Sequence, residues 1–195
     1  MDSENEQAAR KSVIRQRVRS LRGSLSSGER HEADERICDV LWRMDLLQEC
    51  HVVIGYRSHR GEANIDRLLE HLLQSGKTLF APRVVSPTEL DLCPVRNLQA
   101  DFSAGAFGIA EPNTSADLAP VEGVILVPGV AFDENGVRLG SGRGYYDRLL
   151  PRLGLGVISI GVAYECQIVS DLPFDPWDQL VDCVVTDVGI LRRNF

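Results

Sequence analysis

The stretch from Arg138 to Arg148 gathers residue types that bind phosphate. Three glycines alternate there with small or basic residues, so backbone N–H groups can approach a ligand closely and positive φ angles are tolerated. Three arginines surround these glycines with fixed positive charge. Open backbone amides just before a helix are a common way to hold phosphate. The stretch therefore predicts a nucleotide-phosphate loop.

The glycine spacing leaves a structural alternative open. No Gly-Lys-Ser/Thr ends the stretch, so it is not a Walker loop, and its spacing also differs from the Rossmann fingerprint. A tight strand-to-helix turn with solvated arginines would need the same glycines. The coincidence of glycines with arginines favours phosphate binding.

Two charged features outside this loop can serve the same ligand. Lys11 and Arg15 lie four positions apart in a predicted helix, so they share one face and can reach a polyphosphate together. A solvated basic face is the alternative for this pair. Glu62 lies in a loop after a predicted strand, where a solvated carboxylate is the alternative.

Neighbouring strands would bring Glu62 and Arg143 together. Ligands of parallel α/β sheets bind beyond the carboxyl ends of the strands. The loop 57–64 follows a buried strand predicted at 52–56, and the stretch 128–147 follows another predicted at 124–127. We therefore expect both side chains at one edge of the sheet.

Apolar runs alternate with helical periodicity along the chain, which predicts one three-layer α/β/α domain with a mostly parallel sheet. Residues 1–7 are expected to form a flexible tail and 8–195 the domain. Ser26 opens a helix with a capping box, Pro82 is expected to end a strand, and 97–120 reads as a long loop. The predicted strands are 52–56, 78–81, 90–95, 124–127, 157–162 and 183–186, and the other predicted helices are 8–22, 65–75 and 144–153.

Composition narrows the class of protein. The chain of 195 residues is 44% hydrophobic and 25% charged, which is typical of a soluble globular protein. Its net charge of −7 argues against broad nucleic-acid binding but allows a local arginine cluster to bind a small anion. No apolar run is long enough to span a membrane, and the polar N-terminus is not a secretory signal. The five scattered cysteines contain no C-x-x-C pair, which favours a reducing cytoplasm over a disulfide framework or a zinc site.

The motif Val-Pro-Gly-Val-Ala-Phe-Asp at 127–133, followed by Gly136 and by Arg-Leu-Gly-Ser-Gly-Arg-Gly-Tyr-Tyr-Asp at 138–147, resembles the signature of the 5-formyltetrahydrofolate cyclo-ligase family. Further landmarks extend the resemblance over residues 11 to 187. They are Lys11 with Arg15, Glu62, Ala81-Pro82-Arg83, Phe107-Gly108-Ile109 with Glu111-Pro112, and Trp177-Asp178 with Val181-Asp182 and Thr186-Asp187.

The resemblance implies a fold similar to the NagB/RpiA/CoA-transferase-like group and a reaction that needs ATP and Mg²⁺. In that reaction 5-formyltetrahydrofolate is cyclised to 5,10-methenyltetrahydrofolate, and ADP and phosphate are released. Phosphoryl transfer needs positioning and charge neutralisation more than covalent help. The resemblance implies a cytoplasmic enzyme whose folate can be polyglutamylated. We expect a monomer, with a dimer as the alternative, and no nucleic-acid or membrane partner.

The same resemblance implies a role for each candidate residue. Arg143 and Tyr145 would be catalytic, Arg57 and Glu62 would bind the folate together with Tyr145, and Asp147 and Asp178 would hold Mg²⁺. Asp147 as a plain helix carboxylate and Tyr146 as a core residue are the alternatives, and Trp177 stands where many members have histidine. The implied ATP-binding residues are Lys11, Arg15, Arg138, Gly140, Ser141, Gly142, Arg143, Gly144, Tyr145 and Tyr146.

Two competing functions remain from the sequence. A relative of the same fold could bind nucleotide or folate without catalysis, although every residue expected for turnover is present. A different α/β enzyme could act on a phosphorylated sugar or a thioester, but the sequence contains no clear pair of base and nucleophile.

Overall fold

Seven short strands form a central sheet in the order β11-β10-β9-β6-β1-β2-β3. The computed structural model describes residues 2–105, 108, 110–116 and 120–192. The five inner strands are parallel, and the edge strands β3 and β11 run antiparallel to their neighbours. The strand bounds are β1 Val52–Ile54, β2 Thr78–Val84, β3 Leu90–Val95, β6 Glu122–Pro128, β9 Gly156–Val162, β10 Cys183–Val185 and β11 Ile190–Arg192.

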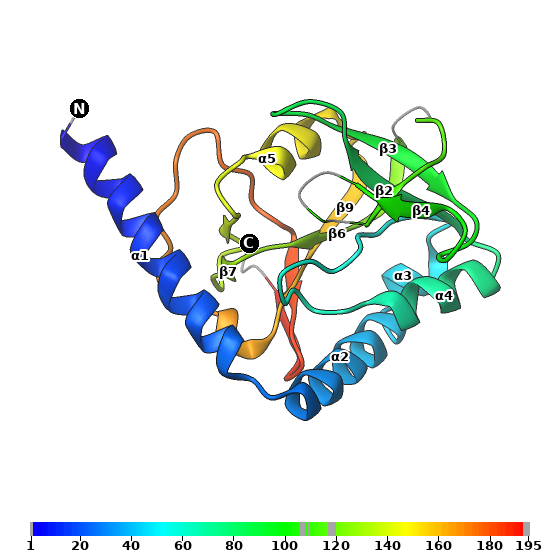
Figure 1. The fold of residues 1–195 in the computed structure, drawn as a ribbon, viewed down its shortest axis with the longest axis horizontal. Coiled ribbons are helices and arrows are strands. Elements are labelled where there is room, and N and C mark those ends of the chain that lie inside the picture. Colours follow the sequence, from blue (N-terminus) through cyan, green and yellow to red (C-terminus); the bar gives the residue numbers. More distant parts are fainter. Residues whose placement is uncertain (1, 106–107, 109, 117–119, 193–195) are drawn as a thin grey trace.

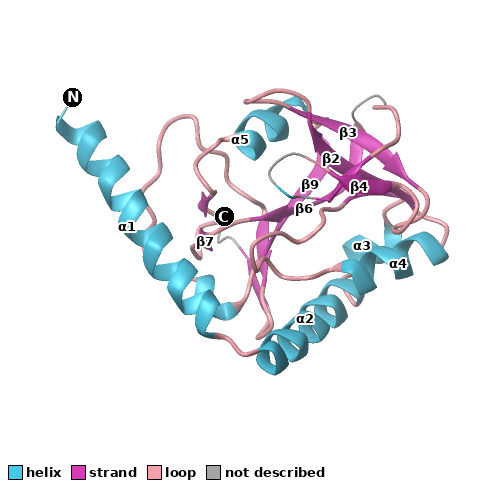
Figure 2. Cartoon of the chain, in the orientation of Figure 1, coloured by secondary structure: helices cyan, strands magenta, loops and turns pink. Residues whose placement is uncertain are grey.

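Helices cover both faces of this sheet, which confirms the predicted α/β architecture (Figures 1 and 2). Successive strand residues point to opposite faces, so Val53 packs with α2 and α4 whereas Ile54 packs with α5. The helix bounds are α1 Asp2–Ser24, α2 Ser27–Trp42, α3 Asp45–Glu49, α4 Asp66–Gln74 and α5 Tyr145–Leu149, with 3₁₀ turns η2 Leu150–Arg152 and η3 Glu165–Gln167.

A small hairpin carries the glycine stretch and lies against α1. It pairs β7 (Ala131–Phe132) with β8 (Arg138–Leu139). The buried side chain of Asp133 closes the turn, because its Oδ1 accepts bonds from the backbone N–H groups of Asn135 and Val137, both at 2.9 Å. Val18 of α1 packs into the same apolar cluster as the hairpin, so α1 is fixed relative to the glycine stretch.

The strand order reverses between β1 and β6. The chain continues from β1 to β2 on one side, and from β6 to β9 and β10 on the other. Such a switch point leaves a crevice beyond the carboxyl ends of the two strands, because their following loops diverge. The loop with Glu62 and the stretch with Arg143 both border this crevice, as we expected.

Several elements differ from the sequence predictions. Helix α1 begins at Asp2 rather than Ala8, so the predicted tail is helical from residue 2, and Gln7 Nε2 donates to Phe174 O at 2.8 Å. Strand β2 continues through Pro82 to Val84, because its pairing with β1 ends at Phe80 and the missing N–H of proline breaks no pair there. The predicted loop 97–120 contains the hairpin of β4 (Phe102–Ala104) and β5 (Ala110–Pro112). Of the landmarks there, Phe107 and Ile109 lie outside the described residues.

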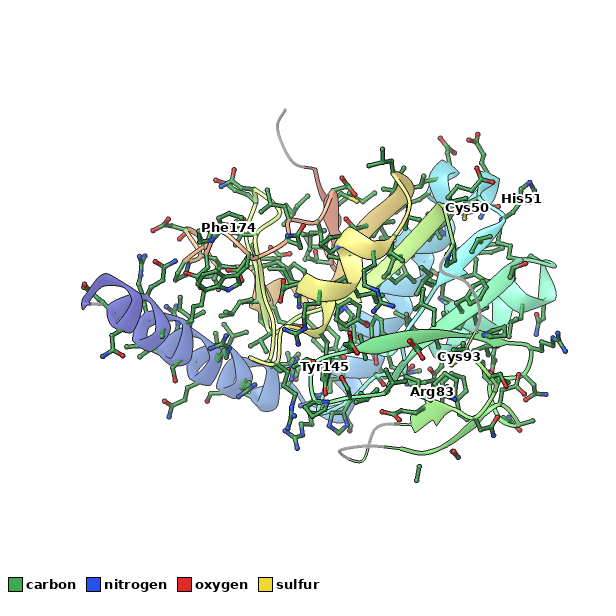
Figure 3. The ribbon with its side chains drawn as sticks, turned by 90° about the horizontal axis from the view of Figure 1, so that it is seen from above. Cys50, His51, Arg83, Cys93, Tyr145 and Phe174 are labelled. Atoms are coloured by element: carbon green, nitrogen blue, oxygen red, sulfur yellow. The ribbon has the colours of Figure 1, made fainter. Side chains whose placement is uncertain are left out.

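The described helices include none that is both long and apolar enough to cross a membrane. All five cysteines are free. Figure 3 shows Cys50 far along the molecule from Tyr145, so this thiol is remote from the crevice.

Candidate active site

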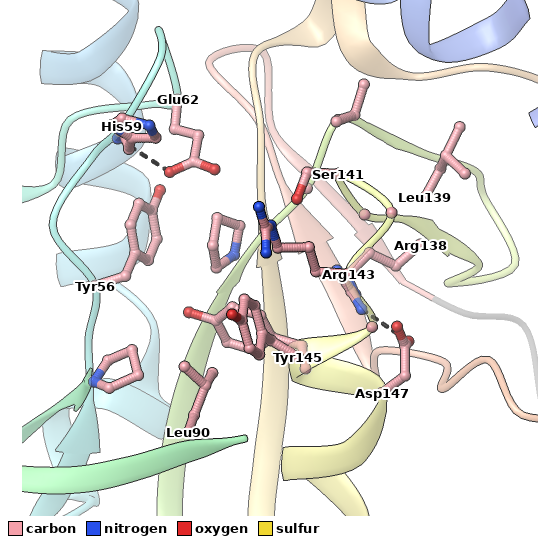
Figure 4. Close-up of a pocket in the computed structure, with 18 of the residues that line it drawn as sticks. Tyr56, His59, Glu62, Leu90, Arg138, Leu139, Ser141, Arg143, Tyr145 and Asp147 are labelled. Carbon is pink, nitrogen blue, oxygen red and sulfur yellow. Dashed lines mark hydrogen bonds and ion pairs between the residues drawn. The ribbon is translucent and has the colours of Figure 1, made fainter. Parts of the chain in front are cut away.

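A cavity of about 590 Å³ occupies the crevice between α1, the loop after β1 and the glycine stretch (Figure 4). Every candidate residue from the sequence lines it, which brings together side chains from far-apart parts of the chain. These residues are Lys11, Arg15, Arg57, Glu62, Arg138, Gly140, Ser141, Gly142, Arg143, Gly144, Tyr145, Tyr146, Asp147 and Asp178.

The glycine stretch needs glycine for its backbone shape. Gly142 has a φ of +107° and Gly144 a φ of +66°, and both values lie in the region that disfavours other residues. A Cβ on Gly140 would lie 2.8 Å from Nη1 of Arg138. The stretch therefore forms the tight turn that was the alternative to a phosphate loop. Its backbone is also exposed on the cavity wall. Figure 4 shows the Arg143 side chain reaching into the cavity from this turn.

Helix α1 contributes the predicted basic pair. Arg15 Nε donates to Gly140 O at 2.8 Å, which ties α1 to the turn. Lys11 is only 7% exposed, and its Nζ bonds Asp175 at 2.6 Å and Asp178 at 2.5 Å. Although burial acts to lower the pKa of Lys11, these two carboxylates raise it above its ordinary value. Lys11 and Arg15 are thus fixed on the cavity wall rather than forming a solvated face.

Arg138 lies behind the turn and holds Asp147. Its Nη2 donates to Asp147 Oδ1 at 2.7 Å, and its guanidinium carbon lies 5.5 Å from the centre of the Tyr146 ring. Arg138 is 5% exposed, and its Nε has no hydrogen-bond partner among the described residues. Tyr146 packs against the apolar core on the α5 face, as its structural alternative predicted.

The opposite wall carries a buried carboxyl group. Glu62 Oε2 accepts a bond from the backbone N–H of His59 at 3.1 Å. Burial raises the pKa of Glu62 from 4.5 to about 7, although that bond and the charges of Arg22 and Arg138 oppose the shift. Tyr56 donates from its hydroxyl to Ala63 O at 2.9 Å and so fixes the loop. Glu62 is therefore not a solvated loop acid.

Three buried polar atoms of cavity-lining residues have no hydrogen-bond partner among the described residues: His59 Nε2, Glu111 Oε1 and Arg138 Nε. Buried polar groups are normally hydrogen-bonded, so these three atoms are available to a ligand. Arg138 was a candidate from the sequence, whereas Glu111 was only a landmark of the family resemblance. The loop position of His59 predicted a solvated imidazole, but its Nε2 is buried.

Tyr145 and Arg57 lie at the rim of the cavity. The Tyr145 hydroxyl donates to Ser86 O at 3.4 Å, and its ring borders the cavity (Figure 4). Arg57 already pairs with Asp66 at 3.3 Å and lies over the Phe102 ring at 5.1 Å. Its charge is therefore partly neutralised within the protein.

The two candidate metal ligands lie on adjacent walls. The backbone N–H of Gln179, the residue after Asp178, donates to Asp147 Oδ1 at 3.4 Å. The described residues contain no cluster of three or more His, Cys, Asp or Glu that could hold a metal ion by itself. Mg²⁺ often takes only one or two carboxylates together with phosphate oxygens and water, so this donor set fits Mg²⁺ carried by a nucleotide.

Comparisons with known proteins show the family of this chain. The chain matches the model of the 5-formyltetrahydrofolate cyclo-ligase family over residues 7–187. The cyclo-ligase of Haemophilus influenzae is 30% identical over 170 residues, which cover 85% of this chain and 91% of the relative. That of Escherichia coli is 30% identical over 175 residues, with 87% and 96% covered.

Solved structures share the fold. The NMR structure of 5,10-methenyltetrahydrofolate synthetase from Aquifex aeolicus superposes with a TM-score of 0.83 at 37% identity, covering 95% of this chain and 93% of that one. The synthetase from Mycoplasma pneumoniae gives a TM-score of 0.70 at 26% identity, with 91% and 98% covered. This chain therefore belongs to the 5-formyltetrahydrofolate cyclo-ligase family.

Proposed function

We propose that this protein uses ATP and Mg²⁺ to cyclise 5-formyltetrahydrofolate to 5,10-methenyltetrahydrofolate, with release of ADP and phosphate. One observation carries the proposal beyond family membership. A single cavity has a basic glycine turn on one wall and a buried carboxyl group on the other. The first suits a polyphosphate and the second a pterin, so both substrates can meet there.

ATP lies along α1 and the glycine turn. Arg15 brings positive charge to its phosphates, and Lys11 lies on the same wall, where it pairs with Asp175 and Asp178. The amides from Gly140 to Gly144 bond phosphate oxygens. Arg143 is exposed on the cavity wall and reaches the phosphoryl group that is transferred. Arg138 holds Asp147 through Nη2, and its Nε is left to donate to a phosphate oxygen.

Asp147 and Asp178 would hold the Mg²⁺ that accompanies ATP. This ion would neutralise negative charge on the phosphates. Both carboxylates have fixed positions without the ion, because buried cations hold them: Arg138 holds Asp147 and Lys11 holds Asp178.

The folate lies against the opposite wall. Glu62 accepts bonds from the amino group and a ring N–H of the pterin, a bidentate match for a carboxylate. The unpaired Nε2 of His59 and Oε1 of Glu111 lie on the same cavity and can bond further pterin atoms. Tyr145 covers the ring at the boundary between the two substrates, and Arg57 lies near the glutamate tail, single or polyglutamylated.

The chemistry follows from a poor leaving group. A formamide oxygen does not leave readily, so it first attacks the γ-phosphorus, the bond to ADP breaks, and the oxygen becomes part of a phosphate ester. Arg143 neutralises the charge that develops on the moving phosphoryl group. N10 then attacks the formyl carbon, loses its proton, and the C–O bond breaks to release phosphate.

We place this reaction in the cytoplasm.

An absorbance assay tests the proposal. Purified protein with 5-formyltetrahydrofolate, ATP and Mg²⁺ should build the near-ultraviolet band of the methenyl product, and omission of ATP should abolish it. Binding of both substrates by a folded protein without this band would favour the non-catalytic relative. The glycine turn and Glu62 would then serve binding alone.

A further inference from the structure

A second cavity of about 210 Å³ opens where the end of α1 meets α2 and the loop after β1. Arginines and glycines make up its whole lining: Arg19, Arg22, Gly23, Arg30, Arg60 and Gly61. Three of its four arginines, Arg19, Arg22 and Arg60, also line the candidate active site, so the two cavities adjoin. Arg30 lines only the second.

The positive charge of this cavity is not balanced by ion pairs with carboxylate side chains of the described residues. Within the described part of the chain, none of the four arginines forms an ion pair with Asp or Glu. Burial lowers the pKa of Arg22 and the charges of Arg19 and Arg30 lower it further, although Glu62 and Tyr164 act in the opposite direction. Four clustered guanidinium groups are unusual in a chain whose net charge is −7.

Backbone carbonyls hold two of these guanidinium groups in place. Arg22 Nη2 donates to Arg60 O at 2.6 Å. Arg30 Nη2 donates to Arg22 O at 2.9 Å, and its Nε donates to Leu25 O at 3.3 Å. Because a guanidinium has five N–H donors, these bonds leave donors for a ligand.

Gly61 permits the close approach of Arg30. It has a φ of +79°, and a Cβ there would lie 2.9 Å from Arg30 Nη1. The loop therefore passes directly over the guanidinium group. The cavity is formed before any ligand arrives, which lowers the entropic cost of binding.

We propose that this arginine cavity is an oxyanion site, which binds a phosphate or carboxylate group beside the ligand in the candidate active site. Guanidinium forks match both groups in a bidentate manner. The anion has two sources: free inorganic phosphate, or the glutamyl carboxylates of a folate held in the neighbouring cavity. The second source rests on the proposed function, and the first does not.

Thermal melts in rising sodium phosphate test the site itself. A saturating non-hydrolysable ATP analogue occupies the main phosphate-binding wall, and sodium chloride of equal ionic strength controls for screening. Arg30→Gln changes only the second cavity, and Arg17→Gln removes the same charge from an exposed position of α1. We expect phosphate to raise the melting temperature of the wild type and of Arg17→Gln, and Arg30→Gln to weaken the apparent phosphate affinity about tenfold.

Kinetics with mono- and triglutamyl 5-formyltetrahydrofolate test the second source. If the tail reaches the cavity, Arg30→Gln raises KM for the triglutamyl substrate with little change in kcat, and it leaves KM for the monoglutamyl substrate unchanged. If Arg30→Gln changes only the phosphate dependence of the thermal melts, the site binds free phosphate. If it changes only KM for the triglutamyl substrate, the site binds the glutamyl tail of the folate.

The proposal is overturned if Arg30→Gln behaves like Arg17→Gln in both experiments. Should Arg30→Gln fail to fold, because it loses its bonds to the end of α1, Arg30→Lys replaces it. A lysine can still donate to a backbone carbonyl there, but it lacks the guanidinium fork that binds an oxyanion. Absence of turnover in the wild type would remove the proposed function, and the melts would still decide whether the anion site exists.

Discussion

The Glu62 carboxyl group is largely shielded from bulk solvent, and it lines the candidate active site. Burial raises its pKa to about 7, while the neighbouring charges of Arg22 and Arg138 lower it. A protein that keeps such a group bears a cost in stability, because its charged form loses hydration. Binding of a pterin would offset that cost with two hydrogen bonds to the carboxylate.

Glu62→Gln should make the protein more stable and less active. The folded-state pKa lies above the unfolded value, so the folded protein binds the extra proton and the wild type loses stability as pH rises from 4.5 to about 7. The glutamine has no charge to bury, so the variant does not lose stability over this pH range. Its side-chain oxygen can still accept a hydrogen bond from the backbone N–H of His59. Urea unfolding should show the variant about 3 kcal/mol more stable near pH 8 and equal to the wild type near pH 4.

The activity of Glu62→Gln should also fall, because the amide has one acceptor oxygen whereas the pterin would donate two hydrogen bonds. Glu70→Gln, at an exposed position of α4, is the matched control and should show neither effect. A constant stability difference at all pH values would contradict the buried carboxyl group as the cause.

Arg143→Ala should reduce turnover far more than stability. Its side chain is exposed on the cavity wall, so truncation removes little packing, but it removes a charge that would face the transferred phosphoryl group in the proposed reaction. We expect kcat to fall at least about a hundredfold and the melting temperature to change little. Arg96→Ala, at an exposed position outside the cavity, should change neither. Comparable losses of activity and stability would make Arg143 structural.

At the scale of elements, the glycine turn is shaped by its own backbone and by α1. Gly142→Ala places a side chain where φ is +107°, and the resulting strain should reshape the backbone amides that are proposed to bind ATP. We expect the Kd for ATP to rise about tenfold in calorimetry.

Gly28→Ala controls for this glycine substitution. Gly28 lies in α2, and a Cβ there would meet no atom within 4 Å. That variant should gain about 0.5–1 kcal/mol of stability and keep its ATP affinity. An unchanged Kd in Gly142→Ala would contradict the predicted role of the turn.

Sequence patterns located the long helices and the parallel strands of the sheet but missed several other short segments. The strand at 90–95 and the capping box at Ser26 were predicted correctly, because periodicity and local hydrogen bonds determine them. The antiparallel strand β11 and the hairpin of β4 and β5 were missed, since segments of three residues are too short to show a hydrophobic period, although each pairs with a segment close to it in the sequence. The continuation of β2 beyond Pro82 likewise depends on where its partner β1 ends.

At the scale of the whole molecule, the order of the strands creates the site. The reversal between β1 and β6 brings the loop with Glu62 and the stretch with Arg143 to one cavity, and the rule for parallel sheets anticipated the proximity of these two residues from strand positions alone. The partners of each side chain were not predictable. The pairs Arg138 with Asp147 and Lys11 with Asp178 join residues whose proximity depends on tertiary packing.

Magnesium should bind only together with the nucleotide. The described residues offer two separate carboxylates rather than a cluster, so phosphate oxygens must supply the remaining charged ligands. Thermal melts should show little stabilisation by Mg²⁺ alone and a clear increase when Mg²⁺ is added with a non-hydrolysable ATP analogue. Strong stabilisation by Mg²⁺ without nucleotide would contradict this arrangement.

In the proposed reaction, the formyl oxygen takes the γ-phosphoryl group of ATP and leaves as part of the released phosphate. Isotope transfer measures this: the substrate carries the heavy isotope of oxygen in its formyl group, and the inorganic phosphate released during methenyl formation is analysed by mass spectrometry. If the formyl oxygen attacks ATP, each phosphate released carries the heavy atom. Methenyl product accompanied by unlabelled phosphate would rule this mechanism out.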